Sequence, residues 1–510
     1  MKKIISTILI TLIFVSCEDF LTIETTNLKN TENYPANPAE ASQVLTGIYA
    51  ILSRPNIMCN TTLISELRSD DRLGGGGPGD ISTNAIAQYQ KWSENCFQDA
   101  WNANYMGVYR ANVFMESSPR IKWESEAQQK QMEGEAHYLR AHFYFDLSRL
   151  FGDVCLQKTS QSKIIPRTPA AETYAFIASD LKAAIEKLPE ISYVNTESGR
   201  VTRWAAQALM ARVFLFYTGY YNKESLPLPE GGKISKADVI AWLDECTNTS
   251  KSGHDLVSDF RNLWPYSYVQ EYAFTKNNNL KWEGDGNKET VFAIKYSNKF
   301  ATHEFPYQKS NQVCLFFGLR GQDTNYKELL PFGEGWGFGT VNPKIWNDWA
   351  DDDIRKKGSM FTATDRNELR PIFKYGTNAK DPQMEETTFY QKKYIPINVY
   401  RDVSRADYWN YSCTLYGNTV TDFKLNNTQD MVLIRFADVL LMAAELNEGT
   451  DKGDAFLKRV RDRVNLPPVP ATLANIKQER RFELAFEGIR FFDLLRWHDE
   501  QVLTDNQKDI

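Results

Sequence analysis

A glycine-rich segment beside charged side chains is the first place in this sequence where chemistry could occur. In "ELRSDDRLGGGGPGD", residues 66–80, Asp70, Asp71 and Arg72 precede four consecutive glycines. A phosphate-binding loop would need a Lys and a Ser or Thr after the glycines, at the start of a helix. A calcium loop would need oxygen ligands at alternating positions and a closing Glu. The segment has neither pattern, so it is either a surface turn or a loop that presents polar side chains to another kind of ligand.

Aromatic side chains are the second kind of candidate. They make up 13% of the residues, including 12 Trp and 25 Tyr, and a surplus near the surface would suit flat apolar ligands such as sugar rings. Three stretches place such rings near turns or glycines: Tyr89 and Trp92 downstream of the glycine-rich segment, Trp264 and Tyr266 in "WPYSY", and Trp336 in "FGEGWGFG". Each ring is either a platform on which a ligand stacks or part of the core.

The remaining residues lack the spacing of a cofactor or metal site. The cysteines beyond Cys17 lie far apart, without the close pair that a thiolate zinc site needs. His137 and His142 are five residues apart on a predicted helix, so they do not share a face. The net charge is −6 and there is no basic tract, which argues against nucleic acid as a partner. We therefore expect no cofactor, no metal ion and no nucleic-acid partner.

The first residues, "MKKIISTILITLIFVSCEDF", have the pattern of a secretory signal. A basic start and an apolar stretch over residues 4–15 precede Ser16 and Cys17, and the stretch is too short to span a membrane. A small residue followed by Cys at this place suggests a bacterial lipoprotein in which Cys17 is acylated. The alternative is ordinary cleavage that leaves Cys17 free. We expect residues 1–16 to be the signal peptide.

The elements that must position the candidate residues are mostly helical. In "EGEAHYLRAHFYFDLSRLFGD" the apolar residues fall at spacings of three and four, which predicts one buried helix face. In "VTRWAAQALMARVFLFYTGYY" the small residues Ala205, Ala208 and Ala211 would let another helix approach closely. With further segments near residues 39–52, 99–116 and 174–188, these patterns predict successive helical hairpins.

The rest of the chain has two different characters. Residues 226–430 are rich in Gly, Pro, Asn, Trp and Tyr, and short runs such as "ETVFAIKYS" predict strands in a loop-rich binding region. Near the C-terminus, "DMVLIRFADVLLMAAELNE" and "IKQERRFELAFEGIRFFDLLRW" are each predicted as a helix with an apolar stripe. In the second, a ladder of alternating charge is typical of a salt-bridged helix face; it consists of Glu487, Arg490, Asp493 and Arg496.

Three long motifs together resemble one protein family. "GEAHYLRAHFYFDLSRLFGDV", "LIRFADVLLMAAELNE" and "RRFELAFEGIRFFDLLRW" are similar, in type and in order, to motifs of the SusD/RagB family of outer-membrane nutrient-binding lipoproteins. The resemblance runs from Cys17 to about His498, and it is weak over residues 226–430, the family's variable part. "CEDF" also resembles the acidic stretch that directs such lipoproteins to the outer face of the outer membrane.

The resemblance implies a mostly α fold with four tetratricopeptide-like helix pairs and a loop-rich variable region that contains short strands. Residues 17–225 would form the N-terminal helical part, 226–430 the variable ligand-binding part, and 431–510 the C-terminal helices that pack back on the same single domain. It also implies a cell-surface protein, lipid-anchored at Cys17 in the outer membrane. Such a protein binds a glycan without cleaving it and covers a SusC-like TonB-dependent transporter.

A glycan ligand would give the glycine-rich segment a role. Carboxylate and guanidinium groups bind sugar hydroxyls, so Asp70, Asp71 and Arg72 become predicted ligand residues. Aromatic rings stack on the C–H face of a sugar, which makes platforms of the five rings named above. The alternative for Asp70 and Arg72 is that they cap or brace a helix end.

Two other functions compete with glycan capture. A surface glycoside hydrolase with a helical body would need two carboxylates roughly 5–10 Å apart across a cleft, and a sequence cannot show such a pair. A scaffold that binds only its transporter would not need aromatic rings on exposed loops. Within the resembling family, a peptide instead of a glycan is also compatible with the sequence.

Overall fold

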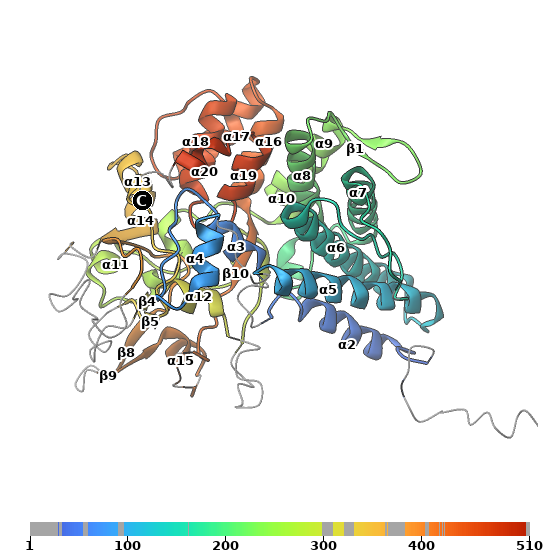
Figure 1. The fold of residues 1–510 in the computed structure, drawn as a ribbon, viewed down its shortest axis with the longest axis horizontal. Coiled ribbons are helices and arrows are strands. Elements are labelled where there is room, and N and C mark those ends of the chain that lie inside the picture. The colour runs from blue at the N-terminus through green and yellow to red at the C-terminus, as the bar shows by residue number, and fades with distance from the viewer. Residues whose placement is uncertain are drawn as a thin grey trace, which may run out of the picture.

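The computed structural model describes residues 29, 33–54, 60–89, 96–161, 163–297, 310–320, 331–362, 365, 383–402, 407–417, 419–420, 422 and 424–505. An array of long helices lies beside a part built of short helices, short strands and loops (Figure 1). The predicted mostly α fold is therefore confirmed. None of the helices in these ranges is both long and apolar enough to cross a membrane.

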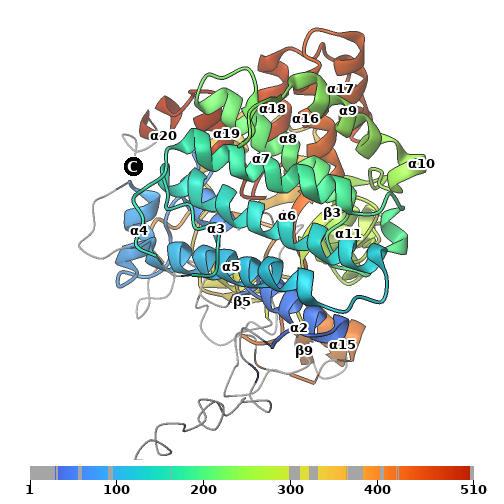
Figure 2. The ribbon, with the colours of Figure 1, turned by 90° about the vertical axis from the view of Figure 1, so that its right-hand side faces the viewer.

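The long helices pack as four successive pairs, which confirms the predicted helical hairpins. Each pair is formed by helices in direct contact: α2 (Pro38–Tyr49) with α5 (Gln98–Ser117), α6 (Glu126–Phe151) with α7 (Ala170–Lys187), α8 (Arg203–Tyr220) with α9 (Lys236–Thr247), and α16 (Phe436–Leu446) with α17 (Asp451–Asp462). Figure 2 shows α5, α6 and α7 lying side by side. Because α9 also contacts α16, the C-terminal pair continues the array despite its distance in sequence.

Local sequence signals set the ends of these helices. Helix α6 begins after Ser125, whose hydroxyl accepts a hydrogen bond from the Gln128 amide, and ends at Gly152 with φ 70°. A side-chain oxygen before the first turn and a glycine after the last turn satisfy backbone groups that the helix leaves unpaired. Before α9, Ser235 and Asp238 form a reciprocal capping box.

Small residues allow the helices to approach closely. A Cβ atom at Gly107 of α5 would lie 2.4 Å from the ring of Phe143 on α6, so only glycine fits there. Ala205, Ala208 and Ala211 of α8 are fully buried, as their spacing predicts. This tight packing gives the array a rigid core on which loops can be held in fixed positions.

The other part of the molecule has its own core of aromatic and aliphatic side chains. The shorter helices of the described residues are α3 (Thr61–Leu67), α4 (Ile81–Ala87), α10 (Thr249–Ser252), α11 (Ala273–Asn277), α12 (Gln312–Phe317), α13 (Pro343–Asp348), α14 (Ile354–Ser359), α15 (Tyr411–Tyr416) and α20 (Gln501–Asp505). The 3-10 turns are η3 (Ser118–Arg120), η4 (Tyr193–Asn195), η5 (Phe260–Leu263) and η6 (Pro265–Tyr268). Of these, η3 and α10 adjoin the long helices α5 and α9.

The strands form two-stranded sheets. The antiparallel pairs are β1 (Leu226–Pro227) with β2 (Lys233–Ile234), β3 (Thr290–Ile294) with β10 (Met431–Arg435), β6 (Met360–Thr362) with β7 (Phe389–Gln391), and β8 (Asn398–Asp402) with β9 (Asp407–Asn410). One pair is parallel and consists of β4 (Leu319–Arg320) with β5 (Glu334–Gly335). Strand β3 lies in the run "ETVFAIKYS", so this predicted strand is confirmed.

Two predicted C-terminal helices are each interrupted. The first begins as strand β10, because its first residues pair with β3 and only the following residues form α16. The second divides into α18 (Leu473–Glu483) and α19 (Arg490–Arg496), since Phe486 and Gly488 have φ values of 66° and 75°. A Cβ atom at Gly488 would lie 2.1 Å from the methyl group of Thr62 on α3. The apolar period continues across the break, which is why the pattern alone predicts one helix.

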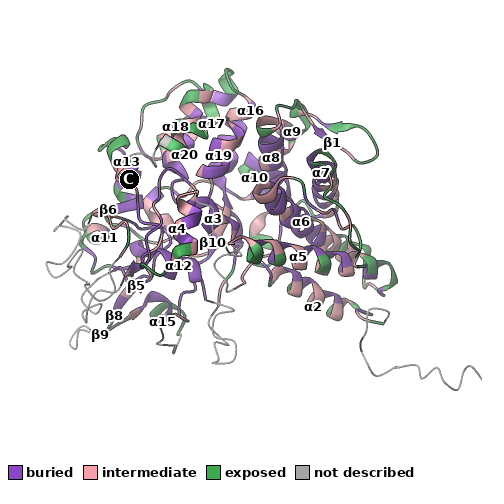
Figure 3. Cartoon of the chain, viewed as in Figure 1, coloured by how far each residue is buried: buried purple, intermediate pink, exposed green. Residues whose placement is uncertain are grey.

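The predicted ladder of charges is buried at Glu487, Asp493 and Arg496 and half-buried at Arg490, and it pairs mainly with distant residues. Asp493 and Arg496 do form an ion pair with each other at 2.8 Å. In contrast, Glu487 accepts hydrogen bonds from Arg435 and Lys393, and Arg490 pairs with Asp70. These charges therefore bind the C-terminal turn to strand β10 and to the glycine-rich segment, and much of this region is buried in Figure 3.

Candidate functional site

Asp70 and Asp71 of the glycine-rich segment are buried ion-pair partners. Each is 2% exposed. Both carboxylate oxygens of Asp70 accept hydrogen bonds from Arg490, at 2.7 and 2.9 Å, and Asp71 accepts one from Arg481 at 2.7 Å. Burial alone would raise the pKa of Asp70, but Arg490 and Arg481 outweigh it and hold the pKa below its ordinary value. The prediction that these carboxylates face a ligand on a surface loop is wrong.

Arg72 is equally enclosed. Its guanidinium donates to Glu66 at 2.9 Å, to the Gly339 carbonyl at 2.7 Å and to Gln391 at 2.6 Å. It also lies between the rings of Phe317 and Phe486, 4.3 and 4.4 Å from their centroids. Arg72 therefore holds the loop-rich part together, which agrees with the alternative that these charges brace the structure. The partner arginines of Asp70 and Asp71 lie more than 400 residues away in sequence, so the local pattern of charge could not reveal them.

The glycines serve chain packing. Gly75 and Gly76 have φ values of 64° and 73°, in the left-handed region that glycine adopts without strain. A Cβ atom would lie 2.5 Å from the Gly337 carbonyl oxygen if placed at Gly75, and 2.3 Å from the Phe338 ring if placed at Gly76. The two glycine-rich stretches, around Gly75 and around Gly337, therefore pack closely against each other.

Trp264 and Tyr266 are core residues. They are 3% and 0% exposed. The Tyr266 hydroxyl donates to the Gly358 carbonyl at 2.9 Å, and the Trp264 ring meets Tyr394 edge-on with centroids 5.7 Å apart. Because both rings are buried, the prediction that they form a stacking platform is wrong. Turn-rich sequence around an aromatic residue does not by itself place that residue at the surface.

The other predicted rings differ in their surroundings. Trp336 is half-buried and packs against the core of the loop-rich part. Tyr89 is also half-buried; its hydroxyl donates to the Arg68 carbonyl, and the Arg68 guanidinium lies 4.1 Å from its ring centroid. Trp92 and Cys17 lie outside the described residues. A ligand role for Tyr89, Trp92 and Trp336 remains a prediction.

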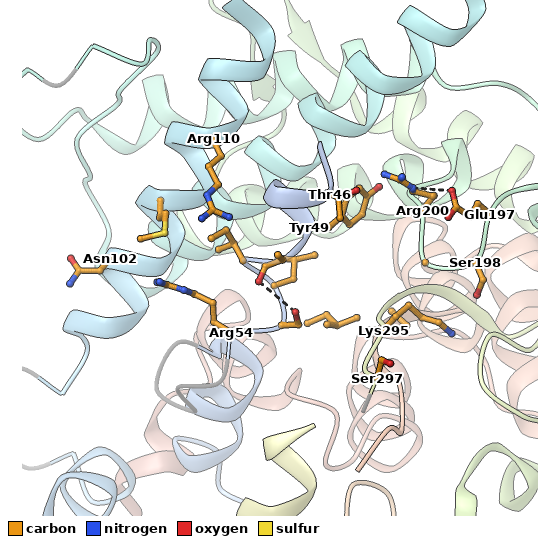
Figure 4. Close-up of a pocket in the computed structure, with 18 of the residues that line it drawn as sticks. Thr46, Tyr49, Arg54, Asn102, Arg110, Glu197, Ser198, Arg200, Lys295 and Ser297 are labelled. Atoms are coloured by element: carbon orange, nitrogen blue, oxygen red, sulfur yellow. Dashed lines mark hydrogen bonds and ion pairs between the residues drawn. The ribbon is translucent and has the colours of Figure 1, made fainter. Parts of the chain in front are cut away.

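A large cavity lies elsewhere, between the helical array and the end of strand β3 (Figure 4). We call it the α2–α5 cavity; its volume is about 980 Å³. Its wall on α5 comes from one face of that helix, at spacings of three and four: Asp99, Asn102, Met106 and Arg110. Helix α2 and the residues after it contribute residues 46 and 49–54, the loop before α8 contributes 197–200, and the end of β3 contributes 293–295 and 297.

One side of the cavity is a fixed polar wall. The Tyr49 hydroxyl donates to Glu135 at 2.6 Å and accepts from the Val201 amide at 2.9 Å. Arg200 lies between two carboxylates, 3.4 Å from Glu135 and 3.3 Å from Glu197. Burial raises the pKa of the Glu135 carboxyl, even though Tyr49 and Arg200 favour its charged form. This wall is already satisfied by its own hydrogen bonds, so it can keep its shape when a ligand enters.

Lys295, on the same side, is paired with a buried acid behind the cavity. Its ammonium group donates to Asp430. Burial, followed by the charge of neighbouring Asp285, raises the pKa of Asp430 to about 7. The two acids are held close together because the Asp430 amide donates to Asp285 at 3.2 Å.

The opposite side of the cavity has polar groups that, among the described residues, form no hydrogen bond or ion pair with another side chain. Asn102 is exposed, while Arg54 and Arg110 are half-buried. Arg110 donates to the Gly47 carbonyl, and neither arginine has a carboxylate partner within the part of the chain that the structure describes. A wide cavity with an amide, guanidinium groups and a preformed polar wall is suited to a ligand that carries many hydroxyl groups.

One local signal in the sequence bears on this cavity, and it lies in helix α5. In α5 the small residues Ala100, Ala103, Gly107 and Ala111 are buried, and Asn102 and Arg110 fall on a different face of the helix. That periodicity predicts a polar helix face without predicting which distant loops cover it.

Two family models match most of the chain. One, described as starch-binding and associating with the outer membrane, matches residues 38–215, and the other, described as the SusD family, matches residues 266–509. SusD-like protein P2 of Formosa agariphila is 26% identical, over 97% of this chain and 91% of its own length. SusD-like protein P25 of the same organism is 22% identical, over 97% and 89%.

Solved structures share the fold. A laminarin-binding SusD-like protein is 25% identical, with a TM-score of 0.74 over 92% of this chain and 94% of its own. Surface glycan-binding protein A from Bacteroides fluxus is 24% identical, with a TM-score of 0.71 over 92% and 91%. The helical array and the loop-rich part therefore recur together in proteins that align with this chain over nine-tenths of both chains.

Proposed function

Because this chain belongs to the SusD family, we propose that it captures a glycan at the cell surface in the α2–α5 cavity. It then delivers the glycan to a SusC-like TonB-dependent transporter in the outer membrane. A lipid on Cys17 anchors it there, facing the cell exterior, and the protein binds its glycan without cleaving it.

The α2–α5 cavity is the observation that carries this proposal. Its volume of about 980 Å³ is at the upper end of the range for small-molecule sites, so it has room for several sugar units. It combines a preformed wall, fixed by Tyr49, Glu135 and Arg200, with Asn102 and Arg54, whose side chains form no hydrogen bond within the described part of the chain. Sugar recognition needs the preformed wall, because an ordered wall lowers the entropy cost of binding. It also needs polar groups that can still form hydrogen bonds with the sugar hydroxyls. The laminarin-binding relative supports a glycan as the ligand class.

Binding in this cavity can be tested by filling it. In Asn102→Trp a bulky ring replaces an exposed side chain on the α5 face that lines the cavity. The matched control is Ala171→Trp, at an exposed position of α7 that does not line the cavity. Isothermal titration against a panel of neutral and acidic oligosaccharides, β-1,3-glucans included, should find a ligand for the wild type. Asn102→Trp should bind it at least tenfold more weakly, and Ala171→Trp should bind it normally.

The same titrations separate capture from hydrolysis. We expect no new reducing ends when the pure protein is incubated with the glycan that it binds. Reproducible cleavage that is lost on changing one carboxylate would favour the hydrolase. A protein that binds no glycan of the panel but binds a peptide in the cavity would also contradict the proposal.

A further inference from the structure

The α2–α5 cavity carries more positive than negative charge, although the chain as a whole has a net charge of −6. The cationic side chains that line it are Arg54, Arg110, Arg200 and Lys295, and the anionic ones are Asp99 and Glu197. A locally cationic site on an acidic protein would attract anionic ligands and repel cationic ones.

Two of the four cations are neutralised by the protein itself. Arg200 is 3.4 Å from Glu135 and 3.3 Å from Glu197, and Lys295 forms an ion pair with Asp430. These pairs belong to the fixed wall of the cavity. They leave Arg54 and Arg110 to account for the excess charge.

Arg54 and Arg110 have no carboxylate partner among the described residues. Arg110 donates to one backbone carbonyl, that of Gly47, and the Arg54 guanidinium forms no hydrogen bond within the described part of the chain. Asp99 lies on the same face of α5 as Arg110, but eleven helical steps place them roughly 16 Å apart along the axis. It therefore cannot neutralise Arg110.

A half-buried guanidinium without a counterion is unfavourable, and two of them in one cavity repel each other. A bound anion would remove both costs. Guanidinium groups bind carboxylate and sulfate oxygens through paired N–H donors, which makes arginine better suited to such groups than lysine. Figure 4 shows Arg54, Arg110 and the neutral donor Asn102 on the side of the cavity opposite Lys295.

We propose that the glycan captured in the α2–α5 cavity is anionic, with carboxylate or sulfate groups that bind to Arg54 and Arg110. This inference rests on the proposed function, since it names the class of glycan that the same cavity accepts. Uronic acid carboxylates and sugar sulfate esters share this chemistry, and the experiment distinguishes them.

The test uses matched pairs of oligosaccharides that differ only in charge. An oligouronide is compared with its carboxyl-reduced form, and a sulfated oligogalactan with its desulfated form, by isothermal titration at low and at high salt. We expect at least one charged form to bind tenfold or more tighter than its neutral partner, with the difference shrinking at high salt. The charged form that binds identifies carboxylate or sulfate as the recognised group.

Arginine variants assign the effect to the cavity. Arg54→Gln and Arg110→Gln should each weaken binding of the charged form about tenfold or more, and should change binding of the neutral form little. Lys122→Gln removes one exposed positive charge that does not line the cavity and should have no effect. Arg110→Lys keeps the charge and serves as a second variant if Arg110→Gln melts early through loss of its bond to the Gly47 carbonyl.

The outcomes separate this inference from the proposed function. Equal affinity for charged and neutral forms, with both lost in Asn102→Trp, would overturn the anionic ligand and leave glycan capture intact. Unchanged binding of the charged form by both arginine variants would also overturn it. No binding of any oligosaccharide would overturn both proposals.

Discussion

Replacing Asp70 by Asn should destabilise the protein while leaving glycan binding intact. The Asp70 side chain is 1% exposed and accepts two hydrogen bonds from Arg490, at 2.7 and 2.9 Å. Arg481 lies 3.7 Å away. The Asn variant keeps the shape and one acceptor but removes the negative charge, so Arg490 and Arg481 lose part of their compensation.

The expected loss follows from the burial of this pair. Breaking a buried ion pair costs about 3–5 kcal/mol, and we expect about 3 kcal/mol because Asn still accepts a hydrogen bond. A chain of this length has an unfolding entropy of about 1 kcal/mol per kelvin near its melting temperature, so the melting temperature should fall by about 3 °C. The matched control is Asp462→Asn. Asp462 pairs with Lys458 on α17, and its side chain is 49% exposed, so this variant should lose under about 1 kcal/mol of stability.

Differential scanning calorimetry checks this prediction, and its pH dependence adds a second test. Arg490 and Arg481 hold the pKa of Asp70 below its ordinary value, so its stabilising contribution is present above pH ~4 and is lost as the pH falls below that value. The difference in melting temperature between wild type and Asp70→Asn should therefore shrink on acidification. A variant that melts like the wild type but no longer binds glycan would refute the reasoning and restore the surface-loop interpretation.

Two further predictions follow from buried residues. Trp264→Ala should lower the free energy of unfolding by about 3–5 kcal/mol, because it leaves a cavity in the core. The variant should melt early, and the folded protein should still bind glycan. Normal melting with lost binding would show instead that Trp264 contacts the ligand. Burial raises the pKa of Asp430 to about 7 in the folded protein, whereas in the unfolded chain the carboxyl ionises at pH ~4. The free energy of unfolding should therefore fall as the pH rises from ~4 to about 7. Asp430→Asn mimics the protonated acid, so its melting temperature relative to wild type should be higher at pH 8 than at pH 5; a constant difference across this range would contradict the raised pKa.

The scaffold could be predicted from the sequence because its signals are local. Apolar spacing on α6, small residues on α8 and three long motifs indicated paired helices and the family, and both predictions are confirmed. The interruptions at Arg435 and Gly488 could not be predicted, since one depends on pairing with β3 and the other on close contact with Thr62 of α3. Distant segments, and not local propensity, decide such boundaries.

The site could not be predicted in the same way. Asp70, Asp71 and Arg72 have the local sequence of a polar surface loop. In the fold, Asp70 and Asp71 pair with Arg490 and Arg481 from the C-terminal helices, and Arg72 pairs with Glu66 of its own segment. Arg54, by contrast, lies in no charged or glycine-rich motif, and it stands out only because no carboxylate of the described residues pairs with it. A sequence shows which residues are charged. The fold decides which of these charged side chains remain available to a ligand.

A crystal structure of the protein with its bound oligosaccharide tests the central claim most directly. We predict sugar density in the α2–α5 cavity, within hydrogen-bonding distance of Asn102 and Arg54. Sugar bound instead over Trp336 or Tyr89, with the cavity empty, would contradict the account.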